Sequence, residues 1–264
     1  MNAELLIMFT LDCDRAYLYA HPERELAPDE TERYDEALAR RASGVPVQYI
    51  TGHQEFWGLG LIVSAAVLIP RPETEHVVEA VLELAKSNIV ERRAPPPVRI
   101  VDVGTGSGAI ALALAKDLPT AQIFATDISP AALEVARANA ARHDLTPRIE
   151  FRQADLLDGF PQASFDFIVS NPPYVGESEE DSVQLEVRKF EPRNAVFAGL
   201  TGLEVIERLI PQAREALRAG GWLVFEISGT IADRVPNLLS SWEGVEVRND
   251  LQGIARVAIA RKRL

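Results

Sequence analysis

The sequence predicts an α/β protein, in which a small helical amino-terminal region precedes a doubly wound, Rossmann-like, mostly parallel seven-stranded sheet. Two observations predict the sheet. From residue 98 onward, short apolar runs alternate with helical segments, a pattern typical of parallel strands with helices on both faces. A glycine-rich turn also follows the first of these runs, as it does where α/β sheets bind nucleotides.

Composition narrows the classes of function. The chain has 264 residues, 47% of them hydrophobic and 25% charged, and a formal net charge of -12. Since proteins that bind nucleic acid through its phosphates usually carry a basic surface, we expect no stable nucleic-acid binding. Cys13 is the only cysteine and the four histidines are scattered, so we expect neither an intrachain disulfide nor a metal site. No apolar run has membrane-spanning length and no secretory signal is evident, which predicts a cytoplasmic protein without membrane contact, and we expect a monomer.

The amino-terminal region is predicted to be helical. Apolar residues between Leu5 and Phe9 form one helical piece and Ala16 to Ala20 a second. A third helix is expected to be capped by Asp29 and ended by Gly44, because short acidic side chains favour the first position and glycine the residue after a helix.

A hairpin and a linker are predicted next. Two short apolar runs within 54–63 flank Gly58 and Gly60, which favours a β-hairpin. The stretch IPRPETE (69–75) leads into a helix, and Ala94-Pro95-Pro96-Pro97 is the strongest linker signal.

Beyond this linker, each element of the sheet can be placed. The last two strands have no helix between them, so one strand is expected to run antiparallel to its neighbours. Strands are predicted at 98–103, 122–126, 149–151, 165–169, 222–227, 244–248 and 254–260, and helices at 109–116, 130–142, 202–218 and 231–239.

The glycine turn indicates a nucleoside site. Glycine lets the backbone turn sharply and approach a ligand, and the following helix offers free N–H groups. Asp127 ends the second strand, where its carboxylate can accept both ribose hydroxyls. Asp155 and Leu156 end the third, where an adenine edge and face would fall. The turn, Gly104-Thr105-Gly106-Ser107-Gly108, fits both S-adenosylmethionine and a dinucleotide, and the glycines alone do not choose between them.

The stretch Asn171-Pro172-Pro173-Tyr174 follows the fourth strand and favours methyl transfer. An asparagine side-chain oxygen and a proline carbonyl are both acceptors, so together they can hold the two hydrogens of one NH₂ group. Tyr174 offers a flat face to a planar substrate. Such a site would aim the nitrogen of a carboxamide, or of adenine, at an activated methyl group.

With these motifs the sequence resembles the protein-(glutamine-N5) methyltransferases that modify peptide chain release factors, the HemK/PrmC family. The resemblance implies a class I S-adenosylmethionine-dependent fold and a Gly-Gly-Gln loop as the acceptor. It rests on RRASGVPVQYITGHQEFWGLGLIV (40–63), VLIPRPETEHVVE (67–79), VDVGTGSGAIALALA (101–115), SNPPYV (170–175), EPRNAVFAGLTGL (191–203) and GGWLVFEI (220–227).

The resemblance also implies roles for particular residues. Asn171, Pro172 and Tyr174 match the catalytic residues that hold the glutamine, and Pro173 and Arg71 are further substrate-contact candidates. The glycines, Asp127, Asp155, Leu156 and Asn171 match the cofactor-binding positions. We expect a docking domain at 1–50 that is about one helix shorter than is usual, a hairpin and linker at 51–72 and a catalytic domain at 73–264.

Other functions stay open on the sequence alone. Adenine's exocyclic amine would satisfy the same acceptors, so N6-adenine methylation of DNA or RNA is an alternative, although the net charge of -12 disfavours it. Methylation of a ribosomal-protein glutamine, binding of S-adenosylmethionine without turnover, and NAD-dependent hydride transfer are further alternatives. The segment 191–199 is expected to form an ordered flap beyond Asn171, and the acidic run 177–181 a solvated loop.

Overall fold

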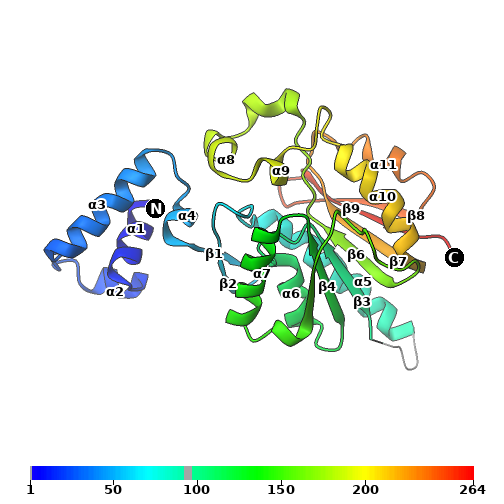
Figure 1. The fold of residues 1–264 in the computed structure, drawn as a ribbon, viewed down its shortest axis with the longest axis horizontal. Helices are drawn as coiled ribbons and strands as arrows, with labels where there is room; N and C mark the ends of the chain where they lie inside the picture. The colour runs from blue at the N-terminus through cyan, green and yellow to red at the C-terminus, as the bar shows by residue number, and fades with distance from the viewer. Residues whose placement is uncertain (1, 92–96) are drawn as a thin grey trace.

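The computed structural model describes residues 2–91 and 97–264 and shows a small helical unit beside a larger α/β domain (Figure 1). Of the predicted linker, Ala94 to Pro96 lie outside the described residues. Among the described residues, no helix is both long and apolar enough to cross a membrane.

The helical unit comprises α1 (Asn2–Leu11), α2 (Arg15–Ala20), α3 (Pro28–Ala42) and α4 (Val47–Thr51). A small apolar core joins α1, α3 and α4 through Leu6, Ala37, Val47 and Ile50.

The predicted cap of α3 was wrong. Ala27 is the N-cap and Pro28 the first helical residue, so Asp29 lies inside the first turn. Proline favours this first position because it lacks an N–H that would otherwise be unpaired. The exposed N–H of Ala27 is instead satisfied by Glu30 Oε2 at 2.9 Å. Gly44 follows the helix with φ +95°, as the sequence predicted for its end.

The hairpin has β1 (His53–Phe56) paired antiparallel with β2 (Leu59–Ile62). Trp57 and Gly58 form its turn, both with positive φ. The buried side chain of Asn139, from the helix α7 (Pro130–Arg142), holds the hairpin against that helix: its Oδ1 accepts from Ile62 N at 2.6 Å and its Nδ2 donates to Ile62 O and Ser107 O. The hairpin is therefore fastened to the glycine turn itself.

The seven-stranded sheet has the order β5-β4-β3-β6-β7-β9-β8, and β9 runs in the direction opposite to the other strands. This confirms the doubly wound, mostly parallel fold and the antiparallel strand near its end. The strands are β3 (Arg99–Val103), β4 (Gln122–Asp127), β5 (Ile149–Gln153), β6 (Phe165–Ser170), β7 (Leu217–Glu226), β8 (Glu243–Asn249) and β9 (Ala255–Arg261).

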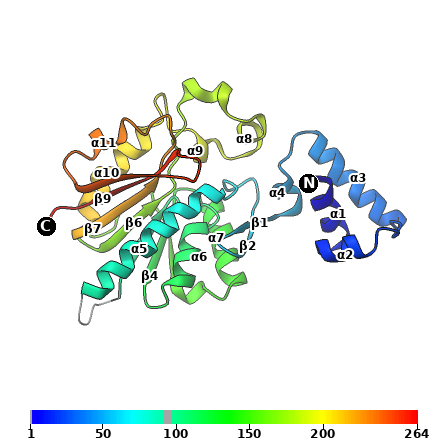
Figure 2. The ribbon, with the colours of Figure 1, turned by 180° about the vertical axis from the view of Figure 1, so that it is seen from behind.

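Helices cover both faces of the sheet (Figures 1 and 2). One core cluster packs α5 and α6 against residues such as Ile100 and Phe167, and the other packs α10 against Val101 and Ile168. Successive strand residues thus point to opposite faces, as the pleat requires. The helices are α5 (Glu75–Glu91), α6 (Ala109–Asp117), α7 (Pro130–Arg142), α8 (Leu185–Phe190), α9 (Arg193–Val196), α10 (Glu204–Ala216) and α11 (Val235–Leu238), with 3-10 turns η1 (Pro72–Thr74), η2 (Thr146–Arg148) and η3 (Glu177–Ser182).

The chain reverses its direction of winding beside β3, which pairs with β4 on one side and β6 on the other. Val103 and Ser170 are register partners, and Ser170 Oγ donates to Val103 O at 2.7 Å. The glycine turn after β3 and the residues after β6 are consequently neighbours at the carboxyl edge of the sheet. Ligands of open α/β sheets bind at such a switch point.

Candidate active site

The glycine turn between β3 and α6 has the left-handed conformation that glycine favours. Gly104 and Gly106 have φ of +71° and +55°, and an added Cβ at either would meet no atom within 4 Å. Beneath the turn, Asp102 Oδ2 accepts from Thr105 Oγ1 at 2.6 Å and from Ala111 N at 3.1 Å. Burial raises the pKa of Asp102 to about 7. Asp102 thus fixes the conformation of the glycine turn from its buried side, and the space beside Gly104 and Gly106 stays open.

Asp127 lies at the end of β4, directly across from this turn. Its Oδ2 accepts from Gly106 N and its Oδ1 from Ser129 N, each at 2.9 Å. Burial raises the pKa of the Asp127 carboxyl, although these backbone N–H groups oppose the rise. A carboxylate held in this way keeps acceptor capacity on both oxygens, because each oxygen has two lone pairs.

Asp155 and Leu156 follow β5 at the same edge. Asp155 Oδ2 pairs with Arg208 of α10 at 2.6 Å. Leu156 has φ +54°, and its carbonyl accepts from Thr126 Oγ1 at 3.0 Å. The ion pair with Arg208 was not foreseen from the sequence.

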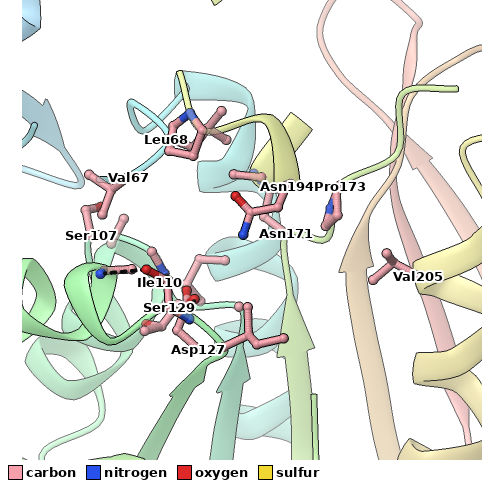
Figure 3. A pocket seen from close by; sticks show the side chains of 18 of the residues that line it. Val67, Leu68, Ser107, Ile110, Asp127, Ser129, Asn171, Pro173, Asn194 and Val205 are labelled. Carbon is pink, nitrogen blue, oxygen red and sulfur yellow. Dashed lines mark hydrogen bonds between the residues drawn. The ribbon is translucent and has the colours of Figure 1, made fainter. Parts of the chain in front are cut away.

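These elements enclose a cavity of about 340 Å³, which we call the inner cavity (Figure 3). Small-molecule sites have volumes of this order. Val67, Leu68 and Ile110 give it apolar walls, while Asp127 and Asn171 supply polar groups. Nine of the predicted site residues line it: Gly104, Thr105, Gly106, Ser107, Asp127, Asp155, Leu156, Asn171 and Pro173. Gly108 does not; its Cβ position is filled by Leu112 and Ala136, so it serves the packing of α6 on α7.

The stretch Asn171 to Tyr174 borders this cavity through Asn171 and Pro173. Asn171 Nδ2 donates to Thr74 Oγ1 at 3.1 Å, and Tyr174 Oη donates to Glu226 Oε1 at 3.0 Å. Burial and the neighbouring Glu226 carboxylate raise the pKa of Tyr174, so its phenol stays protonated. Among the described residues, nothing donates a hydrogen bond to Asn171 Oδ1 or to the Pro172 carbonyl. Both predicted acceptors are free for a ligand.

A second cavity of about 510 Å³, the outer cavity, lies on the other side of the same residues. Asn171 and Pro173 line both cavities, whereas Pro172, Tyr174 and Arg71 line only the outer one. The motif therefore lies between the inner cavity, which contains the glycine turn and Asp127, and the outer cavity.

Arg71 is engaged within the protein. Its guanidinium pairs with the buried carboxylate of Glu191, whose Oε2 also accepts from Ile69 N at 3.1 Å. The pair ties IPRPETE to the segment 191–199. Since about a third of the Arg71 side chain remains exposed in the outer cavity, the same guanidinium can also meet a ligand there.

The segment 191–199 covers the motif, as the sequence predicted. Val175 N donates to Val196 O at 3.1 Å and Ala198 N donates to Val175 O at 2.9 Å. Asn194 and Phe197 of this segment line the inner cavity. The acidic run before it forms η3, where Glu180 pairs with Arg193 and Asp181 with Arg188 at the exposed surface.

Two residues of the site were missed at the sequence level, Thr74 and Glu226. Thr74 stands inside IPRPETE, a stretch that was interpreted from its prolines and charged residues. Glu226 ends the apolar run of β7, and an acid within such a run is a signal of a buried, partnered carboxyl. No group of His, Cys, Asp and Glu side chains in 2–91 or 97–264 could hold a metal ion.

The fold and the two cavities define the class of the protein, a methyltransferase of the doubly wound type. The methyltransferase small domain family matches residues 85–189. A methyltransferase from Pyrococcus furiosus, 17% identical, superposes with a TM-score of 0.57 and covers 87% of this chain and 100% of its own. The hMettl16 catalytic domain, 20% identical, has a TM-score of 0.61 and covers 80% of this chain and 76% of its own. These two structures share the fold alone.

The particular family follows from closer relatives. The PrmC N-terminal domain family matches residues 1–52. A release factor glutamine methyltransferase from Koribacter versatilis is 56% identical over 99% of this chain and 91% of its own. One from Chlorobaculum tepidum is 44% identical over 97% of this chain and 88% of its own. The chain belongs to the release factor glutamine methyltransferase family, as its resemblance indicated.

Proposed function

We propose that this protein transfers a methyl group from S-adenosylmethionine to the side-chain amide nitrogen of the glutamine in the Gly-Gly-Gln motif of class I peptide chain release factors. One observation carries the proposal. Among the described residues, nothing donates a hydrogen bond to Asn171 Oδ1, at the wall shared by the two cavities, or to the carbonyl of Pro172, beside it in the outer cavity. The donor molecule and the acceptor glutamine can thus approach this wall from opposite sides.

The inner cavity fits S-adenosylmethionine. Gly104 and Gly106 leave open the space that a Cβ would fill, so a ligand can lie against the backbone there. Asp127 would accept the ribose hydroxyls, and Leu156 and Ile128 would border the adenine. When bound, the cofactor supplies a methyl group on a positively charged sulfur.

The outer cavity suits a planar carboxamide. The nitrogen of an amide is a weak nucleophile because its lone pair is delocalised into the carbonyl. Two acceptors that hold both N–H bonds return electron density to nitrogen and orient the lone pair, which is catalysis by preorganisation. Asn171 and Pro172 would hold the nitrogen while it takes the methyl group that the cofactor supplies, and the nitrogen would then release one proton to solvent.

The division into a docking domain (1–50), a hairpin and linker (51–72) and a catalytic domain (73–264) is part of the proposal. Pro46 and Gln48 line the outer cavity together with Val183 and Glu186, so the amino-terminal unit borders the acceptor's path. We place the reaction in the cytoplasm, where release factors act, and expect a monomer that binds neither nucleic acid nor membrane stably.

Incubation with isotopically labelled S-adenosylmethionine and a release factor tests the function. We expect label on the glutamine of Gly-Gly-Gln, located by mass spectrometry, and none when that glutamine is replaced by alanine. Label on oligonucleotide adenine, or on a ribosomal-protein glutamine in place of the release factor, would replace this proposal with one of those activities.

A further inference from the structure

Glu226 is a buried carboxyl next to the site that the proposed chemistry does not use. It ends β7 directly after Phe225, which pairs with Ser170 at the end of β6, and Asn171 follows Ser170. Its exposed fraction is 1%, and its Oε2 is buried without a regular hydrogen bond. A buried carboxyl costs free energy, so its contacts have to account for its presence.

Two hydroxyl groups from two different elements face this carboxyl. Tyr174 Oη donates to Oε1 at 3.0 Å. Thr74, from η1, lies beside the carboxyl outside regular hydrogen-bond geometry and is close enough to lower the pKa of Glu226, whereas burial raises it more strongly. The charged groups that also face Glu226 are Arg256 of β9 and Glu73 of η1.

Thr74 links the carboxyl to Asn171. A threonine hydroxyl has one proton to donate. An ionised Glu226 can only accept, so it draws the Thr74 proton toward itself and leaves Thr74 Oγ1 as the acceptor for Asn171 Nδ2 at 3.1 Å. The Asn171 amide is then oriented with Nδ2 toward Thr74, and Oδ1 points away from Thr74 and can accept a hydrogen bond from a ligand.

We propose that Glu226, which borders the outer cavity but is only 1% exposed, is a positioning residue that sets the orientation of the Asn171 amide through Thr74 and holds the Tyr174 phenol directly. The inference rests on the proposed function, because an acceptor oxygen at Asn171 is what the glutamine NH₂ requires. In the reversed amide, Nδ2 would face the substrate NH₂ and two donors would oppose each other.

The carboxyl's protonation controls this arrangement. A protonated Glu226 can donate to Thr74, which frees the Thr74 proton for Asn171 Oδ1 and favours the reversed amide. Because the pKa of Glu226 is raised above 4.5, methyl transfer should lose activity as pH falls through a value above the ordinary glutamate range. The carboxamide substrate has no group that titrates there.

Two measurements on the same proteins test the proposal. The first is the nuclear Overhauser effect between the Asn171 Hδ2 protons and the Thr74 methyl group in the selectively labelled full chain, recorded from pH 7.5 to 5. The second is the pH profile of kcat for release-factor methylation. The variants are Glu226→Gln, Thr74→Val and Thr74→Ser, with Glu150→Gln on the exposed surface of β5 as the matched control.

We expect the Overhauser effect in the wild type where Glu226 is ionised, and its loss as the pH is lowered. Glu226→Gln and Thr74→Val should lower kcat about 10-fold or more and abolish the fall of kcat at acid pH (the acid limb of the profile). The KM for S-adenosylmethionine should change less than about 2-fold. Glu150→Gln should behave as the wild type in both measurements, and Thr74→Ser, which lacks the methyl group observed in the first, should keep the wild-type pH profile of kcat.

Absence of the Overhauser effect in the wild type, or wild-type kcat and acid limb in Thr74→Val, would overturn the positioning role even if Glu226→Gln fails to fold. A wild type that shows the effect but methylates no glutamine would support the amide orientation and contradict the proposed function instead.

Discussion

At the scale of single residues, Asn171 lines both cavities, and the proposal assigns its side-chain oxygen to the acceptor glutamine. Replacing Asn171 by Ala removes one of the two acceptors proposed to hold the glutamine NH₂. We expect kcat to fall by roughly 10²-fold or more, the usual cost of losing one preorganised group, while the Kd for S-adenosylmethionine changes little. Calorimetry and a methylation assay measure the two quantities.

The matched control is Asn237→Ala, on the exposed surface of α11. It should leave both quantities unchanged. Methyl transfer that survives intact in Asn171→Ala would remove this residue from the proposed chemistry.

The buried carboxyl of Asp102 should make the stability of the protein depend on pH. Its pKa rises from 3.8 in the unfolded chain to about 7 in the folded one, because of burial. The folded state therefore holds a proton that the unfolded state loses between pH 4 and 7, so this residue's contribution to the free energy of unfolding falls as pH rises through that window. The total change is on the order of a few kcal/mol.

Asp102→Asn keeps an acceptor for Thr105 and Ala111 but cannot ionise. Urea unfolding at pH 5, 6, 7 and 8 should show a weaker loss of stability with pH in the variant than in the wild type. Parallel curves for the two proteins would mean that Asp102 does not titrate in this range.

At the scale of elements, Gly202 connects the motif to the start of α10. It has φ +80°, and an added Cβ would lie 2.4 Å from the Tyr174 carbonyl oxygen. Gly202→Ala must therefore strain the backbone at residue 202 and also displace the backbone of Tyr174. We expect a loss of roughly 2–4 kcal/mol in the free energy of unfolding and a lower kcat, since Tyr174 leaves its place beside Glu226.

Gly253 is the control that separates backbone strain at the substituted glycine from displacement of the Tyr174 backbone. It also has φ +80°, but its Cβ position is empty to 4 Å. Gly253→Ala should cost only about 1 kcal/mol and leave kcat unchanged. Equal effects of the two substitutions, measured by urea unfolding and methylation assay, would show that the contact with Tyr174 is unimportant.

How far the sequence predicts these elements depends on the range of their contacts. Helix α7 was predicted at its observed bounds, Pro130–Arg142, because the Ser129 cap and the proline after it are local signals. The helix predicted at 202–218 was too long at its end, because Leu217 pairs with Phe165 and continues into β7. Pairing across the sheet overrides a local pattern.

The same distinction holds for the site. The residues of the glycine turn and of the wall after β6 were predicted because each stretch carries its own pattern of residue types. Thr74 and Glu226 were not, since Thr74 lies 97 residues before Asn171 and only the folded chain brings its hydroxyl within hydrogen-bond reach. The ion pair of Arg71 with Glu191 spans 120 residues and was hidden for the same reason.

At the scale of the whole molecule, one ion pair bridges the amino-terminal unit and the α/β domain. Arg41 of α3 pairs with Glu186 of α8, and in both views α8 lies on the side of the domain that faces the amino-terminal helices (Figures 1 and 2). Gly44 lies against Phe190 in the same contact. Because Pro46 and Glu186 both line the outer cavity, we expect the Arg41–Glu186 pair to influence acceptor binding there.

Charge reversal tests this bridge. A partly exposed pair contributes about 1 kcal/mol or less to stability, so Arg41→Glu and Glu186→Arg should unfold almost as the wild type does. Each should nevertheless raise the KM for an intact release factor about 2- to 5-fold, with a smaller change for a short Gly-Gly-Gln peptide that does not reach α3. The double variant should regain part of the loss, since the opposite charges face each other again.

The control reverses Asp29 and Arg33, an exposed pair within α3. It involves no contact between the two units, so the KM values for the release factor and for the peptide should both stay at the wild-type level. If the control raises the KM for the release factor as much as Arg41→Glu does, the effect belongs to the charge of α3 and the bridge to α8 has no part in acceptor binding.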